Sequence, residues 1–202
     1  MTLLLATNNP HKKDELERLF PGTVLRLPAE VGLGGWDHEE TAESFQGNAL
    51  GKARSLWELS QRRWPVLADD SGICVDALEG APGVISARWG SAEAGRALTD
   101  GEKNTLLLAR MLGVADRRAR FVCALALVLA PHREVVVEEA WEGEVAHTPS
   151  GKAGFGYDPV FWLPGLGCTS ADLPAEEKNR LSHRYRASLR LAAVLANLEE
   201  YP

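Results

Sequence analysis

An apolar run that passes directly into two adjacent carboxylates constrains this chain more than any other feature. Residues 66–68 are apolar enough for a buried strand, and Asp69-Asp70-Ser71-Gly72 follows at once. Buried carboxylates need a partner for their charge, and a hard divalent cation is a natural one. Because adjacent strand residues point to opposite faces, we expect only one of Asp69 and Asp70 to reach a metal squarely, unless Gly72 bends the chain. The alternative is a strand-to-turn junction in which one of the two forms an Asx-turn.

Length and charge narrow the class of protein. A chain of 202 residues fits one domain, or one domain with a lobe, and its net charge of −6 argues against general affinity for nucleic acid. A local cation or a metal can still hold a small anionic substrate. The cysteines at 74, 123 and 168 are scattered without a CxxC spacing, and the longest apolar stretch, 121–131, is too short to span a bilayer. We therefore expect a cytoplasmic protein with no membrane partner.

Helical and strand patterns alternate along the chain. The expected strands are residues 2–6, 24–27, 66–68, 73–75, 119–130, 134–145 and 159–162. The expected helices begin at Pro10 and cover 41–61 (with Thr41 as a possible cap), 102–112, 174–178 and 182–200. Residues 131–133 predict a hairpin between the two longest strands. The interleaving predicts an α/β fold with a mixed sheet.

The segment Thr7-Asn8-Asn9-Pro10-His11-Lys12 joins the first strand to the first helix. Such a junction presents free backbone N–H groups to any anion that docks there. A lysine in the first helical turn opposes the helix dipole unless an anion is bound. The alternative is that Asn9 simply caps the helix and Lys12 is solvated.

A second polar set precedes and lines the next helix. Asn48 and Lys52 are four residues apart and share one polar stripe, while Glu40 lies near the expected helix start. Glu40 is interpreted either as an acid that favours the helix dipole or as a metal ligand.

Two further motifs favour a ring-bearing, phosphorylated ligand. The run Gly151-Lys152-Ala153-Gly154-Phe155-Gly156-Tyr157-Asp158-Pro159 allows close backbone approach, and its two aromatic rings could stack on a base, although a flexible hairpin connection would look similar. Lys178 and Ser182-His183-Arg184 form a basic helix start that suits a phosphate or is simply solvated. Together with the paired carboxylates, these motifs indicate a metal-assisted enzyme that acts on a phosphorylated, ring-bearing substrate.

Five motifs also resemble one known family. They are Thr7-x-Asn9-x-x-Lys12, Asp69-Asp70-Ser71-Gly72, Ala81-Pro82-Gly83-Val84-x-Ser86-Ala87-Arg88, Gly154-Phe155-Gly156-Tyr157-Asp158-Pro159-x-Phe161 and Lys178-x4-Ser182-His183-Arg184. In this order and spacing, they resemble the inosine triphosphate pyrophosphatase family, also called the Ham1-like proteins.

The resemblance implies a single nucleoside-triphosphate pyrophosphatase domain over residues 1–202. Its expected fold is an elongated mixed sheet flanked by helices, with two lobes and a central substrate cleft. The implied reaction is Mg²⁺-dependent hydrolysis of noncanonical purine nucleotides (ITP, dITP and XTP) to the monophosphate and pyrophosphate by a homodimer.

By matching position, the resemblance implies that Asp70 is the proton acceptor and that Glu40, Asp70 and Asp69 hold the Mg²⁺. The implied substrate-binding residues are Thr7, Asn8, Asn9, Lys12, Lys52 and Ser71 on the phosphate side, and Phe155, Gly156, Tyr157, Asp158, Lys178, His183 and Arg184 on the side of the base and sugar. The sequence departs from the family at Asn8, where many members have glycine, and a side chain there could crowd the phosphate turn.

Two rival functions remain open at this point. One is a pyrophosphatase of the distantly similar Maf type, which acts on pyrimidine or modified nucleotides. The other is a nucleotide sensor or RNA-binding module without catalysis, against which the paired carboxylates argue because they repel phosphate unless a metal is bound.

Overall fold

The computed structural model describes residues 2–200 of the chain, and the side chains of residues 2–196. The chain divides into two compact units. The first unit comprises the chain up to Asp70, Cys123–Glu139 and the chain from His183 onward. The second unit comprises Ser71–Val122 and Ala140–Ser182. No helix in the described part of the chain is long and apolar enough to cross a membrane.

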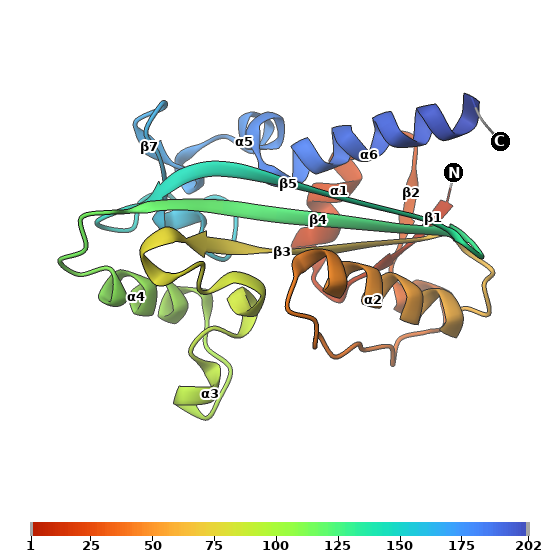
Figure 1. The fold of residues 1–202 in the computed structure, drawn as a ribbon, viewed down its shortest axis with the longest axis horizontal. Coiled ribbons are helices and arrows are strands. Elements are labelled where there is room, and N and C mark those ends of the chain that lie inside the picture. Colours follow the sequence, from red (N-terminus) through yellow and green to blue (C-terminus); the bar gives the residue numbers. More distant parts are fainter. Residues whose placement is uncertain (1, 201–202) are drawn as a thin grey trace. The chain divides into compact units, whose positions relative to one another are not determined.

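A mixed sheet of seven strands runs through the described residues, in the order β2-β1-β3-β4-β5-β6-β7. The strands are β1 (Thr2–Ala6), β2 (Val24–Arg26), β3 (Val66–Val75), β4 (Arg118–Ala130), β5 (Arg133–Val145), β6 (Phe161–Leu163) and β7 (Cys168–Thr169). The helices are α1 (Pro10–Leu19), α2 (Phe45–Leu59), α3 (Ser91–Ala94), α4 (Asp100–Arg110), α5 (Ala175–Leu181) and α6 (His183–Glu200). The predicted α/β class with a mixed sheet is therefore confirmed (Figure 1).

Parallel pairing in the first unit brings two chemically important segments to one level of the sheet. β1 pairs with both β2 and β3, and the register aligns Ala6 with Ala68. The carboxyl ends of parallel strands meet at the same edge of a sheet. The turn that begins at Thr7 therefore starts beside Asp69 and Asp70.

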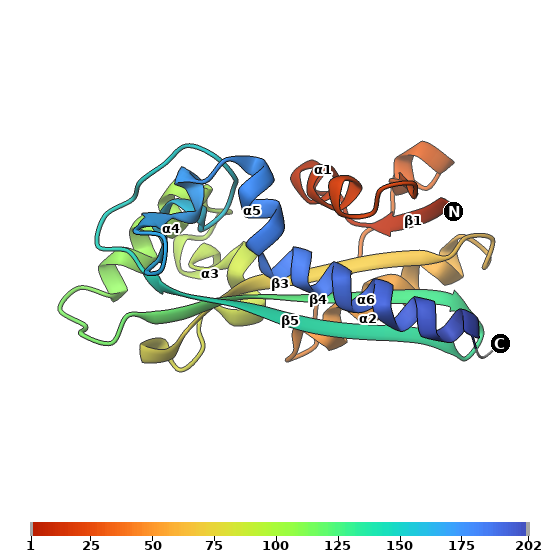
Figure 2. The ribbon, with the colours of Figure 1, turned by 90° about the horizontal axis from the view of Figure 1, so that it is seen from above.

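Helices cover both faces of the sheet in the first unit. α2 lies on one face, and α1 and α6 lie on the other (Figures 1 and 2). The core against α1 and α6 is built from alternate strand residues, including Leu5, Leu67 and Leu125, together with Leu16 and Leu191 from the two helices. This two-sided cover buries β3 completely at Asp69 and Asp70.

The core of the second unit is aromatic. Phe161 lies 4.3 Å from Phe121 and 5.4 Å from Trp141 between ring centroids. Ile73 and Leu107 pack in the same cluster, so β3 and α4 are fixed to it. Such aromatic pairs add to the free energy gained from buried area.

The expectation that a turn follows Asp70 is wrong. β3 continues without interruption from Val66 to Val75, so the residues predicted as an acidic turn and a return strand belong to one strand. The carboxylates do not need a turn to reach solvent because the helices on each face supply cations to them. Gly72 permits a close contact here, since a Cβ would overlap the Ser86 hydroxyl and the Gly83 carbonyl.

Helix starts also differ slightly from the sequence prediction. α2 begins at Phe45 because Ser44, and not Thr41, is its N-cap, and the Ser44 hydroxyl accepts from the N–H of Gly47 at 3.1 Å. Thr99 caps α4, which begins two residues earlier than predicted. α1 begins at Pro10 as predicted, and α6 begins at His183, one residue after the predicted start.

We expect Gly72→Ala to destabilise the protein by about 1–3 kcal/mol, because the added methyl group must displace Ser86 or the backbone of Gly83. Urea denaturation measures the loss. Gly101→Ala is the control, since no atom lies within 4 Å of a Cβ at this position in α4, and alanine there should stabilise by about 0.5–1 kcal/mol. Equal effects of the two substitutions would contradict the steric explanation.

Candidate functional site

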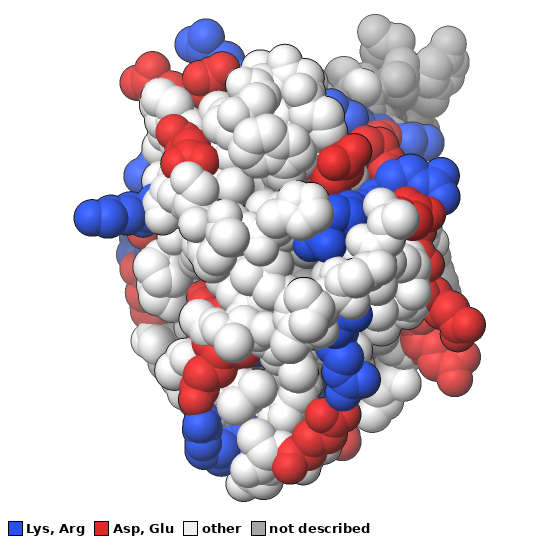
Figure 3. Space-filling model, turned by 90° about the vertical axis from the view of Figure 1, so that its left-hand side faces the viewer, with Lys and Arg blue, Asp and Glu red and all other residues white. Residues whose placement is uncertain are grey.

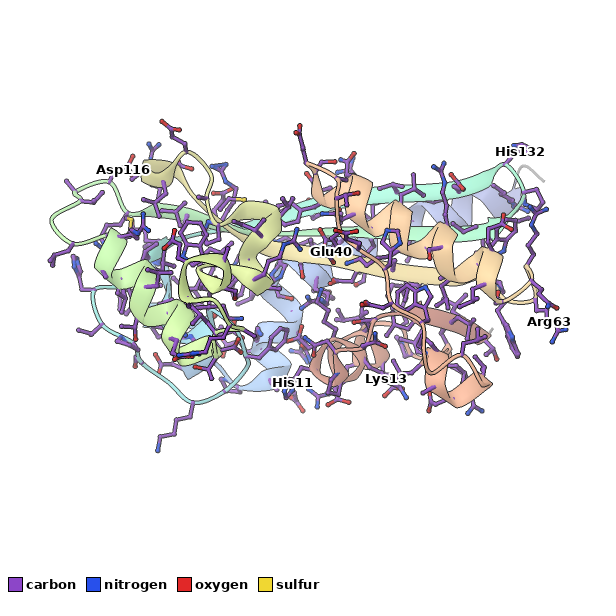
Figure 4. All side chains as sticks on the ribbon, turned by 90° about the horizontal axis from the view of Figure 1, so that it is seen from below. His11, Lys13, Glu40, Arg63, Asp116 and His132 are labelled. Atoms are coloured by element: carbon purple, nitrogen blue, oxygen red, sulfur yellow. The ribbon has the colours of Figure 1, made fainter. Side chains whose placement is uncertain are left out.

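One lysine joins two carboxylates in the first unit. The Lys52 Nζ donates to Glu40 Oε1 at 2.6 Å and to Asp70 Oδ1 at 2.9 Å, and Asn48 Nδ2 donates to Asp70 Oδ2 at 3.3 Å. The shared polar stripe of Asn48 and Lys52 thus faces Asp70. Figure 4 shows Glu40 on the loop that leads into α2. The Asp70 and Lys52 side chains are buried, so their charges interact with little screening.

The surroundings of Glu40 and Asp70 shift the pKa values of these two acids in opposite directions. Burial raises the pKa of Asp70 to about 6, and the Glu40 charge adds to the rise while Lys52 opposes it. Burial also acts to raise the pKa of Glu40, but the charge of Lys52 and its hydrogen bond outweigh burial and lower the pKa. Glu40 is therefore ionised at neutral pH, whereas Asp70 can gain and lose a proton near it.

The donor set fits a hard divalent cation. Mg²⁺ commonly takes one or two protein carboxylates and completes its shell with water and substrate phosphates. Glu40 and Asp70 already converge on one cation, the Lys52 ammonium, so their oxygens are close enough to share another. Within residues 2–196, no group of three His, Cys, Asp or Glu side chains is placed to hold a metal.

Asp69 faces the opposite side of β3. Its carboxylate binds Lys12 Nζ at 2.5 Å and Arg184 Nε at 2.9 Å, and the Cys123 thiol lies 3.2 Å from it. Arg184 also forms an ion pair with Glu15. Burial acts to raise the pKa of Asp69, but Arg184 and Lys12 together hold it well below its usual value. The structure does not bring Asp69 to the pair formed by Glu40 and Asp70.

The turn at residues 7–12 has the predicted strand-to-helix form. The Asn9 side chain accepts from the N–H of His11 at 2.9 Å and so caps α1, while the Thr7 hydroxyl accepts from the N–H of Asn9 at 3.1 Å. Asn8 donates from Nδ2 to the carbonyl of Trp36 at 3.2 Å. The non-glycine residues with positive φ in the described chain are Gln61, Arg62, Glu79 and His132, so the turn does not need glycine at position 8.

Asp158 organises the glycine-aromatic loop in the second unit. Its Oδ2 accepts from the N–H of Phe155 at 2.8 Å and from Lys178 Nζ at 2.7 Å, and its Oδ1 accepts from the Ser170 hydroxyl at 2.7 Å. Lys178 Nζ lies 5.2 Å from the centre of the Phe155 ring, within the range of a cation–π contact. The half-buried Phe155 ring is thus fixed where it could still receive a base.

Tyr157 does not offer a ring face as the sequence motif led us to expect. Its side chain is buried in the aromatic core, and its hydroxyl donates to the carbonyl of Ser86 at 2.9 Å. Of the remaining predicted residues, His183 is buried at the first position of α6 in the first unit, and Ser71 follows Asp70 in β3.

The sequence analysis did not identify Asp100 and Asn104, in the first turns of α4, as residues that contact the glycine-aromatic loop. Asp100 Oδ2 accepts from the N–H of Gly156 at 2.7 Å, and Asn104 Nδ2 donates to the carbonyl of the same glycine at 3.0 Å. The only signal in the sequence was the position of Lys103 and Asn104 on the face of the helix that also carries Leu107, where apolar residues were expected.

The fold and the site define a class: mixed α/β proteins that carry a lysine-bridged pair of carboxylates and a strand-to-helix turn at residues 7–12. The chain belongs to the Ham1 family, whose model matches residues 3–194. The predicted family resemblance is therefore confirmed.

Named relatives match this chain over nearly its full length. A dITP/XTP pyrophosphatase of Treponema denticola is 44% identical, over 93% of this chain and 94% of that protein. A dITP/XTP pyrophosphatase of Methylibium petroleiphilum is 43% identical, over 96% and 97% respectively. The Ham1 protein structure from Coxiella burnetii has a TM-score of 0.85 and 36% identity, with 98% of this chain and 99% of that chain covered.

We expect asparagine at the two adjacent aspartates to change stability in opposite directions. Asp69→Asn leaves the buried Arg184 without its full counter-charge and should cost about 3–5 kcal/mol at pH 8. Asp70→Asn removes a carboxylate whose pKa is raised on folding, and in EDTA it should stabilise by about 1–3 kcal/mol at pH 8. Denaturation of both variants with urea measures these changes.

The pH dependence provides the control. The raised pKa of Asp70 means that its ionisation costs stability above about pH 6, and this cost disappears as the pH falls toward 3.8. The lowered pKa of Asp69 means that its contribution is present above pH 3.8 and is lost only as the pH falls through its folded value. The gain from Asp70→Asn should therefore shrink toward pH 4, and a constant gain would contradict this account.

Proposed function

We propose that this protein is a Mg²⁺-dependent nucleoside-triphosphate pyrophosphatase that removes noncanonical purine nucleotides, dITP, ITP and XTP, from the nucleotide pool. The products are the monophosphate and pyrophosphate. The observation that carries the proposal is the Glu40–Lys52–Asp70 centre, in which Lys52 and Asp70 are buried, in a chain that is 44% identical to a named dITP/XTP pyrophosphatase.

Asp70 is the proton acceptor in this proposal. A carboxylate whose pKa is about 6 is ionised at neutral pH, yet it is basic enough to take a proton from the attacking water. Lys52 Nζ donates to Asp70 Oδ1 and Asn48 donates to Oδ2, so the carboxylate is held in one orientation. Pre-orientation of the acceptor lowers the entropic cost of the step.

Glu40 and Asp70 would hold the Mg²⁺, which would neutralise the charge of the triphosphate. Lys52, between the two acids, supplies a positive charge. Burial acts to lower the pKa of Lys52, but the charges of Asp70 and Glu40 outweigh burial and raise it, so the ammonium stays protonated. The Thr7–Lys12 turn adds the backbone N–H groups at the start of α1. Asp69 supports this turn through Lys12.

Base recognition would come from Phe155, with Asp158 and Lys178 behind its loop, and the family resemblance adds His183. Arg184, which the resemblance also implied, is instead buried in ion pairs with Asp69 and Glu15. A site that pairs with the 6-oxo group of hypoxanthine or xanthine leaves a buried polar group unpaired when an amino purine enters, and such mismatches discriminate strongly. The substrate cleft between two lobes, the homodimer and the cytoplasmic location accompany this proposal as predictions from the family resemblance.

The charge distribution supports a small substrate over nucleic acid. The net charge is −6. On the face shown in Figure 3, blue and red side chains lie mixed around a broad uncharged area, and the basic ones do not form a stripe. A nucleic-acid-binding surface would need such a stripe to follow the phosphate backbone.

We expect rapid pyrophosphate release from dITP and XTP, far slower release from dATP and dGTP, and none in EDTA. The measurement is a coupled pyrophosphate assay with each nucleotide, with and without Mg²⁺. Asp70→Asn should abolish turnover in the same assay. Activity confined to dTTP would favour a Maf-type enzyme, and tight nucleotide binding with no turnover would favour a sensor.

Glu40→Gln should raise the Mg²⁺ concentration for half-maximal activity by about tenfold or more, because one of two carboxylate ligands is neutralised. Glu39→Gln is the matched control, since Glu39 is the adjacent acid on the same loop and is exposed. A Mg²⁺ titration of dITP hydrolysis separates them, and an identical response of both variants would remove Glu40 from the metal site.

A further inference from the structure

Side chains in the first turns of α4 bind both the N–H and the carbonyl of Gly156, which lies in the glycine-aromatic loop (residues 151–159). The N–H of Gly156 donates to Asp100 Oδ2 at 2.7 Å, and its carbonyl accepts from Asn104 Nδ2 at 3.0 Å. Gly156 has φ +61°, and no atom lies within 4 Å of a Cβ at this position. Hydrogen bonds to two side chains of α4 therefore hold the Gly156 peptide, between the half-buried Phe155 and the buried Tyr157.

α4 is a rigid support for these contacts. Leu107 and Met111 are fully buried in the aromatic core, so the end of the helix away from the loop cannot shift easily. The start of the helix is capped by Thr99 and Glu102 in a capping box. The Asp100 carboxylate is therefore not required as the helix cap and can bind the loop.

The chemistry of Asn104 indicates a role other than helix stability. Asparagine is a poor residue for a helix interior, and burial of its amide costs free energy unless both ends are satisfied. Asn104 is only 5% exposed, and within the described part of the chain its Oδ1 has no hydrogen-bond partner. The hydrogen bond to Gly156 is the contact that its amide does make.

Lys103 extends the support to the neighbouring residue of the loop. Its Nζ lies 2.8 Å from Asp100 Oδ1 and donates to the carbonyl of Ala87 at 3.2 Å. The carbonyl of the adjacent Ser86 accepts from the Tyr157 hydroxyl. The two residues after Phe155 are thus both hydrogen-bonded: Gly156 to Asp100 and Asn104 of α4, and Tyr157 to Ser86, the neighbour of the residue that Lys103 binds.

We infer that Asp100 and Asn104 are positioning residues that set the place of the Phe155 ring and thereby the selectivity for the base. The inference rests on the proposed function, because it concerns the base side of that site. Neither residue needs to touch the substrate. Loss of either contact frees the Gly156 peptide, so the ring no longer meets the base in one fixed position.

The experiment compares Asp100→Ala, Asp100→Asn and Asn104→Ala in the full-length protein. Asp116→Ala is the matched control, since the Asp116 side chain is 45% exposed, that of Asp100 is 49% exposed, and both belong to the second unit. The readouts are KM and kcat for dITP and dATP, and hydrogen exchange of the segment 153–158.

We expect Asp100→Ala and Asn104→Ala to raise KM for dITP about tenfold, with kcat within about twofold of wild type. The ratio of kcat/KM for dITP over dATP should fall, and segment 153–158 should exchange faster. Asp100→Asn keeps an oxygen acceptor for the Gly156 N–H and should restore most of the affinity. Asp116→Ala should match wild type in every readout.

Three results would overturn the inference: unchanged KM in both alanine variants, an equal loss for dITP and dATP, or no rescue by Asp100→Asn. Failure of the wild type to release pyrophosphate from dITP would instead count against the proposed function. In that case the exchange measurement decides the inference by itself, because unchanged protection of segment 153–158 in the alanine variants contradicts the support by α4.

Discussion

Two adjacent buried carboxylates in the middle of a largely buried strand require compensation on both faces of the sheet. Because side chains alternate along a strand, Asp69 and Asp70 cannot share one set of partners. Each face must therefore supply its own cation, Arg184 and Lys12 on one side and Lys52 on the other. This requirement explains why helices of the first unit that are distant in sequence pack against the same short stretch of β3.

The two faces use the same residue type for different purposes. On the side of Asp69, ion pairs lower the pKa of the carboxyl and make its charge a source of stability. On the side of Asp70, burial and the nearby Glu40 raise the pKa, so its ionisation costs stability that a bound cation can offset. Perturbed acids of the second kind are typical of functional sites, whereas the first kind is typical of structural ion pairs.

In the second unit, hydrogen bonds to backbone groups, and not ion pairs between buried side chains of two faces, hold the glycine-aromatic loop at Phe155 and Gly156. No atom lies within 4 Å of a Cβ at Gly156, and Asp158 within the loop and Asp100 and Asn104 outside it hold the backbone through hydrogen bonds. A loop held in this way can present a ring such as Phe155 with an open face. The hydrogen bonds of Asp100 and Asn104 make α4 a support for the Gly156 peptide, the residue directly after Phe155.

The sequence alone determined the α/β class, most element positions and the chemistry of the motifs, because these depend on local periodicity and on residue types at short spacings. The alternation rule even predicted that Asp69 and Asp70 would part. Only the tertiary structure decided that β3 continues past them and that Asp69 pairs with Arg184, 115 residues away. It also decided that Asp100 of α4 accepts a hydrogen bond from the N–H of Gly156. These outcomes depend on contacts between segments far apart in the chain, and no local pattern specifies which charged partner arrives at a buried position.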